Sequence, residues 1–171
     1  MIIIDSVIGN INNDKKLKEK YDEMSSKNCC ERIKTSRLES QRSRMRKRSD
    51  RGADLALTFP PGTRLKHGDV IILTENKMVI VEIEAEDVLM IEIKENIHGD
   101  DDIQVPLRVG HTIGNLHRPI KLERRKIYFP IQAETEIEMF KKLFESINEH
   151  LDIKKRIMIF EPEERMTMYE H

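Results

Sequence analysis

The order of hydrophobic patterns in the second half of the chain constrains its fold more than any other feature. Apolar residues at helical spacing predict an amphipathic helix from Glu134 to about Glu149. We expect a second helix from Pro106 to about Ile113, because proline suits the first turn of a helix and Gly114 suits its C-terminal end. Short β-branched runs surround both helices. The predicted order is strand, helix, strand, strand, helix, strand, which is the ferredoxin-like βαββαβ arrangement.

The first half of the chain shows the pattern of short strands. Residues 53–59 alternate between apolar and polar side chains, and the apolar runs 70–73 and 78–83 follow, with turn residues at 60–62 and 67–69. Several short strands joined by such turns predict a small β-barrel or sandwich-like domain. The polar stretch before them, residues 12–28, is expected to be a long loop or a weak helix.

These patterns predict an α+β protein with two domains. The first is an N-terminal β-rich domain over residues 1–84, and the second is a ferredoxin-like domain over residues 85–161. A flexible C-terminal tail is expected over residues 162–171. Domains of this size lie near the lower limit for burying a core alone, which favours mutual packing or oligomerisation.

The overall charge balance excludes some classes of function. The 30 Lys and Arg residues face 31 Asp and Glu residues, so no net positive field favours general binding of nucleic acid or a membrane surface. No apolar run reaches the roughly 18 residues of a membrane span, and the apolar start is too short for a signal peptide. Cys29 and Cys30 are adjacent, which is poor geometry for a disulfide. We expect a soluble, cytoplasmic protein.

Residues 32–51 form an Arg-rich segment within this neutral chain. Its hydrophobic content is too low for a core element, so we interpret it as a solvated segment or a docking surface for acidic partners. An alternative is an RNA- or protein-binding adaptor that uses this segment. The aromatic pattern of an RNA-binding sheet is missing, and aromatic residues make up only 5% of the chain, so nucleic acid is the less favoured partner.

The most informative motif is the run from Gly110 to Pro119. Gly114 and Asn115 tolerate left-handed backbone conformations, so they are expected to end the preceding helix and turn the chain. His117 follows, and neutral imidazole is a common ligand for nickel, copper and zinc. Taken alone, a single histidine is more often a hydrogen-bonded surface residue than a ligand.

The residues 114–119, Gly-Asn-Leu-His-Arg-Pro, resemble the G-N-x-H-x-P signature of the urease accessory metallochaperones, the UreE family. Residues 57–70 are similar to that family's strand, proline, glycine-threonine and glycine-aspartate stretch, and residues 8–10 also fit. The similarity covers roughly residues 53–160, with weaker agreement before them.

The resemblance implies a nickel-binding metallochaperone, not an enzyme. It implies a partner-binding N-terminal domain and a ferredoxin-like domain that forms a homodimer, in which the signature histidines, here His117, share Ni²⁺ near the two-fold axis. The implied partners are the urease apoprotein and other urease accessory proteins, including a GTPase. Delivery to this maturation complex would proceed by ligand exchange. Zn²⁺ or Cu²⁺ could also bind in vitro, because ligand type alone does not exclude them.

The chain departs from the family pattern at several positions. Leu116 stands where a polar or basic residue is common, and no histidine occurs in residues 129–133. The end of the chain carries one histidine, His171, which is a candidate metal ligand that could fold back to complete the site. His111, six residues before His117, is a candidate supplementary ligand. No hydrolase, phosphate-loop, zinc-protease or dinucleotide motif is present, so no enzymatic activity is predicted.

Overall fold

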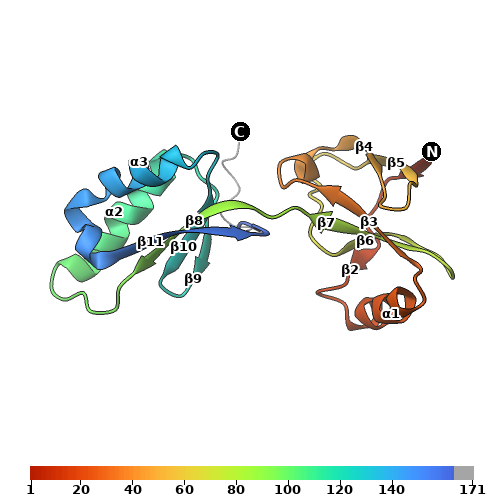
Figure 1. Cartoon of the computed structure of the whole chain (residues 1–171), viewed down its shortest axis with the longest axis horizontal. Coiled ribbons are helices and arrows are strands. Elements are labelled where there is room, and N and C mark those ends of the chain that lie inside the picture. The colour runs from red at the N-terminus through yellow and green to blue at the C-terminus, as the bar shows by residue number, and fades with distance from the viewer. Residues whose placement is uncertain (164–171) are drawn as a thin grey trace. The chain divides into compact units, whose positions relative to one another are not determined.

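The computed structural model describes residues 1–163, and the chain is a mixed α+β protein with three sheets (Figure 1). It divides into two compact units, Met1–Glu84 and Ala85–His171. The α+β class predicted from the sequence is confirmed. No helix among the described residues is long and apolar enough to cross a membrane.

The first unit contains two sheets and one α-helix. Its elements are β1 (Ile2–Ile4), β2 (Gly9–Asn10), α1 (Lys15–Ser26), β3 (Cys30–Thr35), the 3-10 helix η1 (Glu39–Gln41), β4 (Arg44–Arg48), β5 (Asp54–Thr58), β6 (Asp69–Leu73) and β7 (Met78–Ile83). One sheet has the order β2-β6-β7-β3, and the other has the order β1-β5-β4. In both orders, the outermost strands have a neighbour on one side only.

The polar stretch over residues 12–28 contains a regular helix, α1. It begins after Asp14, whose carboxylate accepts hydrogen bonds from the backbone N–H groups of Lys16 and Leu17. Met24 on this helix is 2% exposed and packs with Cys30 in a small core. Of the two expected alternatives, a long loop or a weak helix, the structure has the helix. Capping and a few buried contacts are sufficient for a helix whose surface is otherwise charged.

The composition of the Arg-rich segment predicts a solvated segment, but the structure buries part of it. Within it, Ile33 on β3 is fully buried and Thr35 is 1% exposed, while β3 pairs in parallel with β7. β4 pairs antiparallel with β5. The prediction that this stretch holds no core element is wrong, because a strand buries one face and leaves charged side chains on the other.

The second unit has the element order β-α-β-β-α-β. Its elements are β8 (Glu86–Ile93), α2 (Asp101–Asn115), β9 (Lys121–Glu123), β10 (Lys126–Pro130), α3 (Thr135–Leu143), the 3-10 helix η2 (Glu145–His150) and β11 (Leu151–Met158). The sheet has the order β11-β8-β10-β9, and every neighbouring pair is antiparallel.

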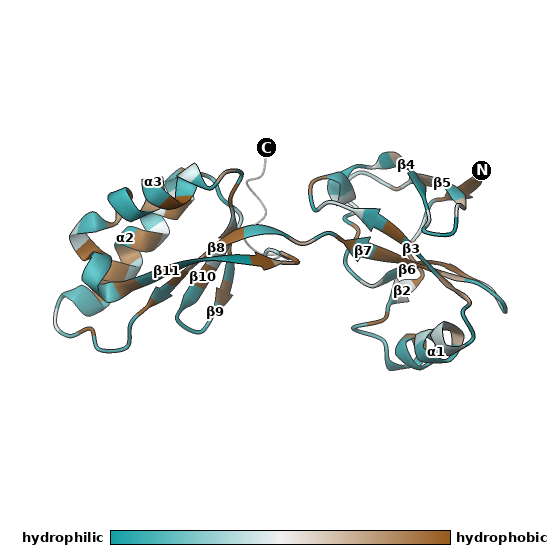
Figure 2. Cartoon of the chain, in the orientation of Figure 1, coloured by the Kyte–Doolittle hydropathy of each residue, from teal (hydrophilic) through white to brown (hydrophobic). Residues whose placement is uncertain are grey.

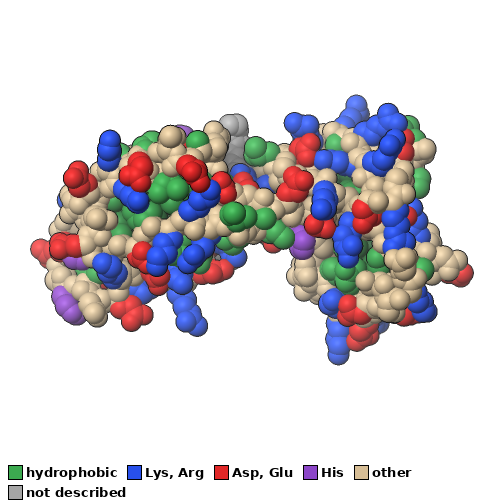
Figure 3. All heavy atoms as spheres, viewed as in Figure 1, with side chains coloured by type: hydrophobic (Ala, Val, Ile, Leu, Met, Phe, Trp, Pro, Cys, Tyr) green, Lys and Arg blue, Asp and Glu red, His purple; other side chains and the backbone are tan. Residues whose placement is uncertain are grey.

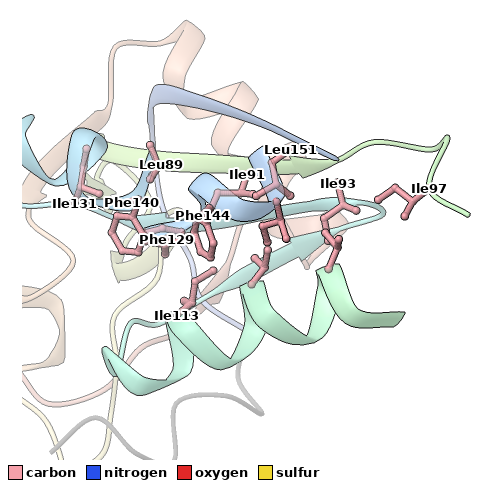
Figure 4. Packing of buried hydrophobic residues seen from close by; sticks show 13 residues of the cluster. Leu89, Ile91, Ile93, Ile97, Ile113, Phe129, Ile131, Phe140, Phe144 and Leu151 are labelled. Atoms are coloured by element: carbon pink, nitrogen blue, oxygen red, sulfur yellow. The ribbon is translucent and has the colours of Figure 1, made fainter. Parts of the chain in front are cut away.

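Both helices of this unit bury an apolar side between helix and sheet, as the mixed colours along α2 and α3 in Figure 2 indicate. Figure 4 shows Phe129 from β10 and Phe140 from α3 in this core, where their ring centroids lie 4.7 Å apart. The buried cluster consists of Leu89, Ile91, Ile93, Ile97, Val105, Val109, Ile113, Phe129, Ile131, Phe140, Phe144, Ile147 and Leu151.

Helix α2 is longer than the sequence predicts at both ends. Pro106 lies inside the helix rather than in its first turn, and Gly114 is also helical. Val105, Val109 and Ile113 recur every four residues and are all buried, so their packing stabilises a continuous helix despite the proline. Conversely, α3 ends at Leu143, and the expected remainder of that helix is the 3-10 turn η2.

Candidate metal site

His117 occupies the left-handed position that ends helix α2. Its φ is 50°, its backbone N–H donates to the Gly114 carbonyl at 3.0 Å, and the N–H of Arg118 donates to the Ile113 carbonyl at 3.5 Å. This pair of bonds is the Schellman arrangement, in which glycine usually takes the left-handed place. A side chain there costs about 1–2 kcal/mol relative to glycine. The prediction that Gly114 ends the helix is therefore wrong, because the chain reverses three residues later.

The residue after His117 anchors this turn to the rest of the unit. The Arg118 guanidinium lies 2.6 Å from the Glu136 carboxylate on α3 and donates at 3.4 Å to the carbonyl of Pro130. The second oxygen of Glu136 accepts the backbone N–H of Gln132 at 2.7 Å. Both charged side chains are mostly buried, so the backbone that carries His117 is held by two structural elements.

An apolar groove of about 630 Å³ adjoins the histidine. Gly110 and Gly114 lie one helical turn apart on its wall, and a Cβ atom added to either would meet no atom within 4 Å. The remaining lining residues are Pro106, Ile113, His117, Arg118, Pro119, Ile120, Leu122 and Ile127. The exposed imidazole therefore stands beside open apolar surface.

Comparison with known proteins identifies proteins of similar sequence. Residues 4–84 match the family described as UreE urease accessory protein, N-terminal domain. The chain is 30% identical over 139 residues to the urease accessory protein UreE of Yersinia pestis (strain Pestoides F). It is 28% identical over 134 residues to the protein of that name from Natronomonas pharaonis. The resemblance to the UreE family is confirmed.

The two UreE matches differ in how much of each protein they cover. They include 79% and 78% of this chain, but only 58% of the Yersinia protein and 61% of the Natronomonas protein. The chain thus spans about three fifths of the length of these relatives. Both relatives are named as accessory proteins of urease rather than as the enzyme itself.

Of the other two histidines predicted as ligands, the structure describes His111. His111 lies on α2, where its Nε2 atom is 2.9 Å from the Nδ2 atom of Asn115, the signature asparagine. One ring nitrogen of His111 is thereby engaged within its own helix. His171 lies outside the described residues. Among residues 1–163, no group of three or more His, Cys, Asp or Glu side chains is placed to hold a metal ion.

Other potential ligands have structural roles. His67 accepts the backbone N–H of Ile83 through Nδ1 at 3.3 Å, within the first unit. Burial raises the pKa of the Cys30 thiol, which disfavours the thiolate that a soft metal ion requires. The sequence missed the Arg118–Glu136 pair, since 18 residues separate its members. The only sequence signal was an arginine directly after the signature histidine.

Proposed function

We propose that this chain is a nickel-binding metallochaperone that delivers Ni²⁺ to the urease maturation complex. In the proposed complex, His117 from each of two chains binds one ion near the two-fold axis of a homodimer. Support comes from the UreE family match and from the signature at residues 114–119. The observation that carries the proposal is the exposed His117, fixed in a left-handed helix end beside an apolar groove.

A site shared between two chains is consistent with the small number of metal ligands that one chain supplies. Nickel needs more than one imidazole, and the described residues contain no cluster of three potential ligands. Two-fold symmetry brings the same residue of both chains to one axis, so it doubles a single ligand without any further sequence motif. His171 remains a candidate additional ligand, and His111 is a weaker one because its Nε2 contacts Asn115.

The surface around His117 has the apolar character that a dimer interface requires. Leu116 is 40% exposed and Leu122 is 43% exposed. Leu122 also lines the groove beside the histidine. A second copy placed over this surface would cover the groove and these side chains together. We therefore propose that Leu116 makes an apolar contact in the dimer, at a position where the family often carries a polar residue.

Delivery by ligand exchange follows from the same geometry. An ion held by few ligands at an exposed helix end leaves coordination positions open, so a partner's ligands can attach before the first ones leave. The proposed recipients are the urease apoprotein and other urease accessory proteins, including a GTPase. The chain itself catalyses no turnover in this proposal, and it functions in the cytoplasm.

Nickel titration by calorimetry tests the binding step on three proteins: the wild type, His117→Gly and His111→Ala. The proposal predicts that His117→Gly abolishes high-affinity binding, whereas His111→Ala reduces affinity less than about tenfold, since it removes at most a supplementary ligand. Affinity of the wild type should fall from pH 8 to pH 5, because protons compete with nickel for the imidazole. Equal binding by wild type and His117→Gly would refute the proposal.

A further inference from the structure

After β11 ends, residues 159–163 cross the open face of the sheet in the second unit. We call these residues the strap. Its central side chain, Phe160, is 1% exposed and packs against Val88, Met90 and Tyr128. The alternate residues of the same strands, such as Leu89 and Phe129, belong to the core beneath the two helices. Because successive side chains of a strand point to opposite faces, the strap covers the face that the helices leave open.

The strap connects the two outer strands of this sheet. It leaves β11 at one end of the order β11-β8-β10-β9, and Glu163 reaches β9 at the other end. The backbone N–H of Glu163 donates to the Ile120 carbonyl at 3.1 Å. The Oε1 atom of Glu163 accepts the backbone N–H of Leu122 at 3.0 Å. Glu163 therefore supplies hydrogen-bond partners to the chain at the outer strand of the sheet.

The two residues that Glu163 contacts also form part of the candidate metal site. Ile120 and Leu122 both line the apolar groove beside the histidine. β9 has only three residues, and β10 is its one strand neighbour in the described part of the chain, so few bonds hold it in place. Arg118 anchors the start of segment 117–122 to α3, and Glu163 anchors the end of that segment.

We propose that Glu163 is a positioning residue for the nickel site, which it serves by holding β9 and the groove wall in place. This inference rests on the proposed nickel function. A site shared across a two-fold axis needs both imidazoles at one ion, so any displacement of the segment that carries His117 occurs twice. Ligands that lack support from their surroundings bind a metal ion weakly. In this proposal Glu163 acts through β9 and is not itself a ligand.

Two substitutions of Glu163 in the full chain separate its hydrogen bond from its charge. Glu163→Ala removes the acceptor for the Leu122 N–H, whereas Glu163→Gln keeps an acceptor oxygen and loses the charge. In nickel titration by calorimetry, we expect Glu163→Ala to bind about tenfold more weakly than the wild type. Glu163→Gln should stay close to the wild type. Wild-type affinity in Glu163→Ala, or equally weak binding by both variants, would overturn the proposal.

Amide hydrogen exchange distinguishes a local role from general stabilisation. Without nickel, the Leu122 amide should exchange about tenfold faster in Glu163→Ala than in the wild type, because the loss of one hydrogen bond favours local opening. The amide of Leu89, in the middle of the sheet, should exchange at the wild-type rate in both proteins. Equal acceleration at Leu122 and Leu89 would mean that Glu163 stabilises the whole unit, and would contradict the positioning role.

The matched control for the lost carboxylate is Glu95→Ala, which removes an exposed glutamate of the same unit. Asp and Glu side chains are interspersed with Lys and Arg side chains over the visible face of this unit (Figure 3). Loss of one carboxylate therefore changes no field of a single sign, and Glu95→Ala should bind nickel like the wild type. A tenfold loss of affinity in Glu95→Ala as well would contradict a specific role for Glu163.

Two further comparisons separate this inference from other sources of nickel affinity. Glu163→Ala should weaken binding by the same factor in the wild type and in His171→Ala. A factor that disappears in His171→Ala would show that Glu163 acts through His171, and would overturn the proposal. If His117→Gly abolishes nickel binding while Glu163→Ala leaves it unchanged, only the role of Glu163 is refuted. Equal binding by the wild type and His117→Gly refutes the nickel proposal itself.

Discussion

Arg118 and Glu136 form an ion pair of 2.6 Å that joins the turn carrying His117 to helix α3. The side chains are 22% and 14% exposed, so water screens their interaction only weakly. Together with the hydrogen bond from Arg118 to the Pro130 carbonyl, the pair connects the signature motif to the remainder of its unit. It makes the orientation of His117 depend on residues far from the motif in the sequence.

Glu136→Gln should destabilise the protein and loosen the turn. The variant keeps an acceptor but loses the charge, and we expect a loss of about 1–3 kcal/mol in the free energy of unfolding. Urea denaturation measures this change. Glu138→Gln is the matched control, because Glu138 forms an exposed pair with Lys141 on the same helix and should contribute less than about 0.5 kcal/mol. Similar losses of unfolding free energy in both variants would show that the Arg118–Glu136 pair stabilises the protein no more than an exposed ion pair does.

The left-handed backbone of His117 predicts an unusual difference between two substitutions. Glycine adopts a φ of 50° readily, whereas alanine is strained there, so His117→Gly should be more stable than His117→Ala by about 1 kcal/mol. Thermal unfolding monitored by circular dichroism measures the difference. At Thr112, inside α2, the order should reverse, since glycine costs about 1 kcal/mol relative to alanine in a helix. The same order at both positions would contradict the left-handed assignment.

Glu31 links stability of the first unit to pH. Burial raises the pKa of its carboxyl group, but hydrogen bonds from Lys77 and Ser49 outweigh this effect, and the net pKa lies below the model-compound value of 4.5. A pKa that is lower in the folded state than in the unfolded state stabilises the protein above pH 4.5, and this stabilisation is lost as the pH falls through the folded value.

As the pH falls into the acid range, the free energy of unfolding of Glu31→Gln should therefore decrease less than that of the wild type. We expect the variant to be less stable than the wild type at pH 7, and the difference to shrink between pH 5 and pH 3 as the wild-type carboxylate is protonated. Urea unfolding at several pH values measures both proteins. A difference that stays constant over this range would show that the Glu31 charge is not linked to folding.

The aromatic pair in the second core should contribute strongly to stability. Phe129 and Phe140 are fully buried, and their ring centroids are 4.7 Å apart. Phe140→Ala should reduce the free energy of unfolding by about 3–5 kcal/mol, because it leaves a cavity and removes the ring contact. Met139→Ala is the neighbouring control on α3, where Met139 is 38% exposed, and should cost much less. Comparable losses would contradict the assigned burial.

The element order of the second unit was predictable because its helices bury a regular stripe. Ile137, Phe140, Phe144 and Ile147 recur at helical spacing and all contact the same core. The length of α2 was not predictable in this way. Gly114 is a normal stop signal, but the actual stop depends on His117, which is left-handed only because surrounding structure, including the Arg118 anchor, holds the turn.

Strand β4 was not predicted from the sequence because of its highly charged composition. Arginines at positions 42, 44, 46 and 48 alternate with smaller or partly buried residues, which is a period-two pattern of the kind that predicts strands. High charge instead favoured a solvated segment. The prediction failed because β4 needs little apolar surface of its own when it pairs with β5, whose Leu55 and Leu57 are buried.

For the candidate site, the sequence indicated His117 and its position just beyond a helix. Neither the groove nor the Glu136 anchor could be predicted, since both depend on how β9, β10 and α3 pack around the motif. The contact between His111 and Asn115 follows from their spacing of four residues in a helix, and only the structure shows that the two side chains meet.

Native mass spectrometry of the nickel-loaded protein tests the central proposal most directly, because it counts ions and chains in one particle. Sharing of His117 across a two-fold axis predicts a dimer that carries one tightly bound nickel ion, and an ion-free particle for His117→Gly at the same nickel concentration. A monomer with its own nickel ion, or a dimer that retains its ion without the His117 imidazole, would contradict the shared site.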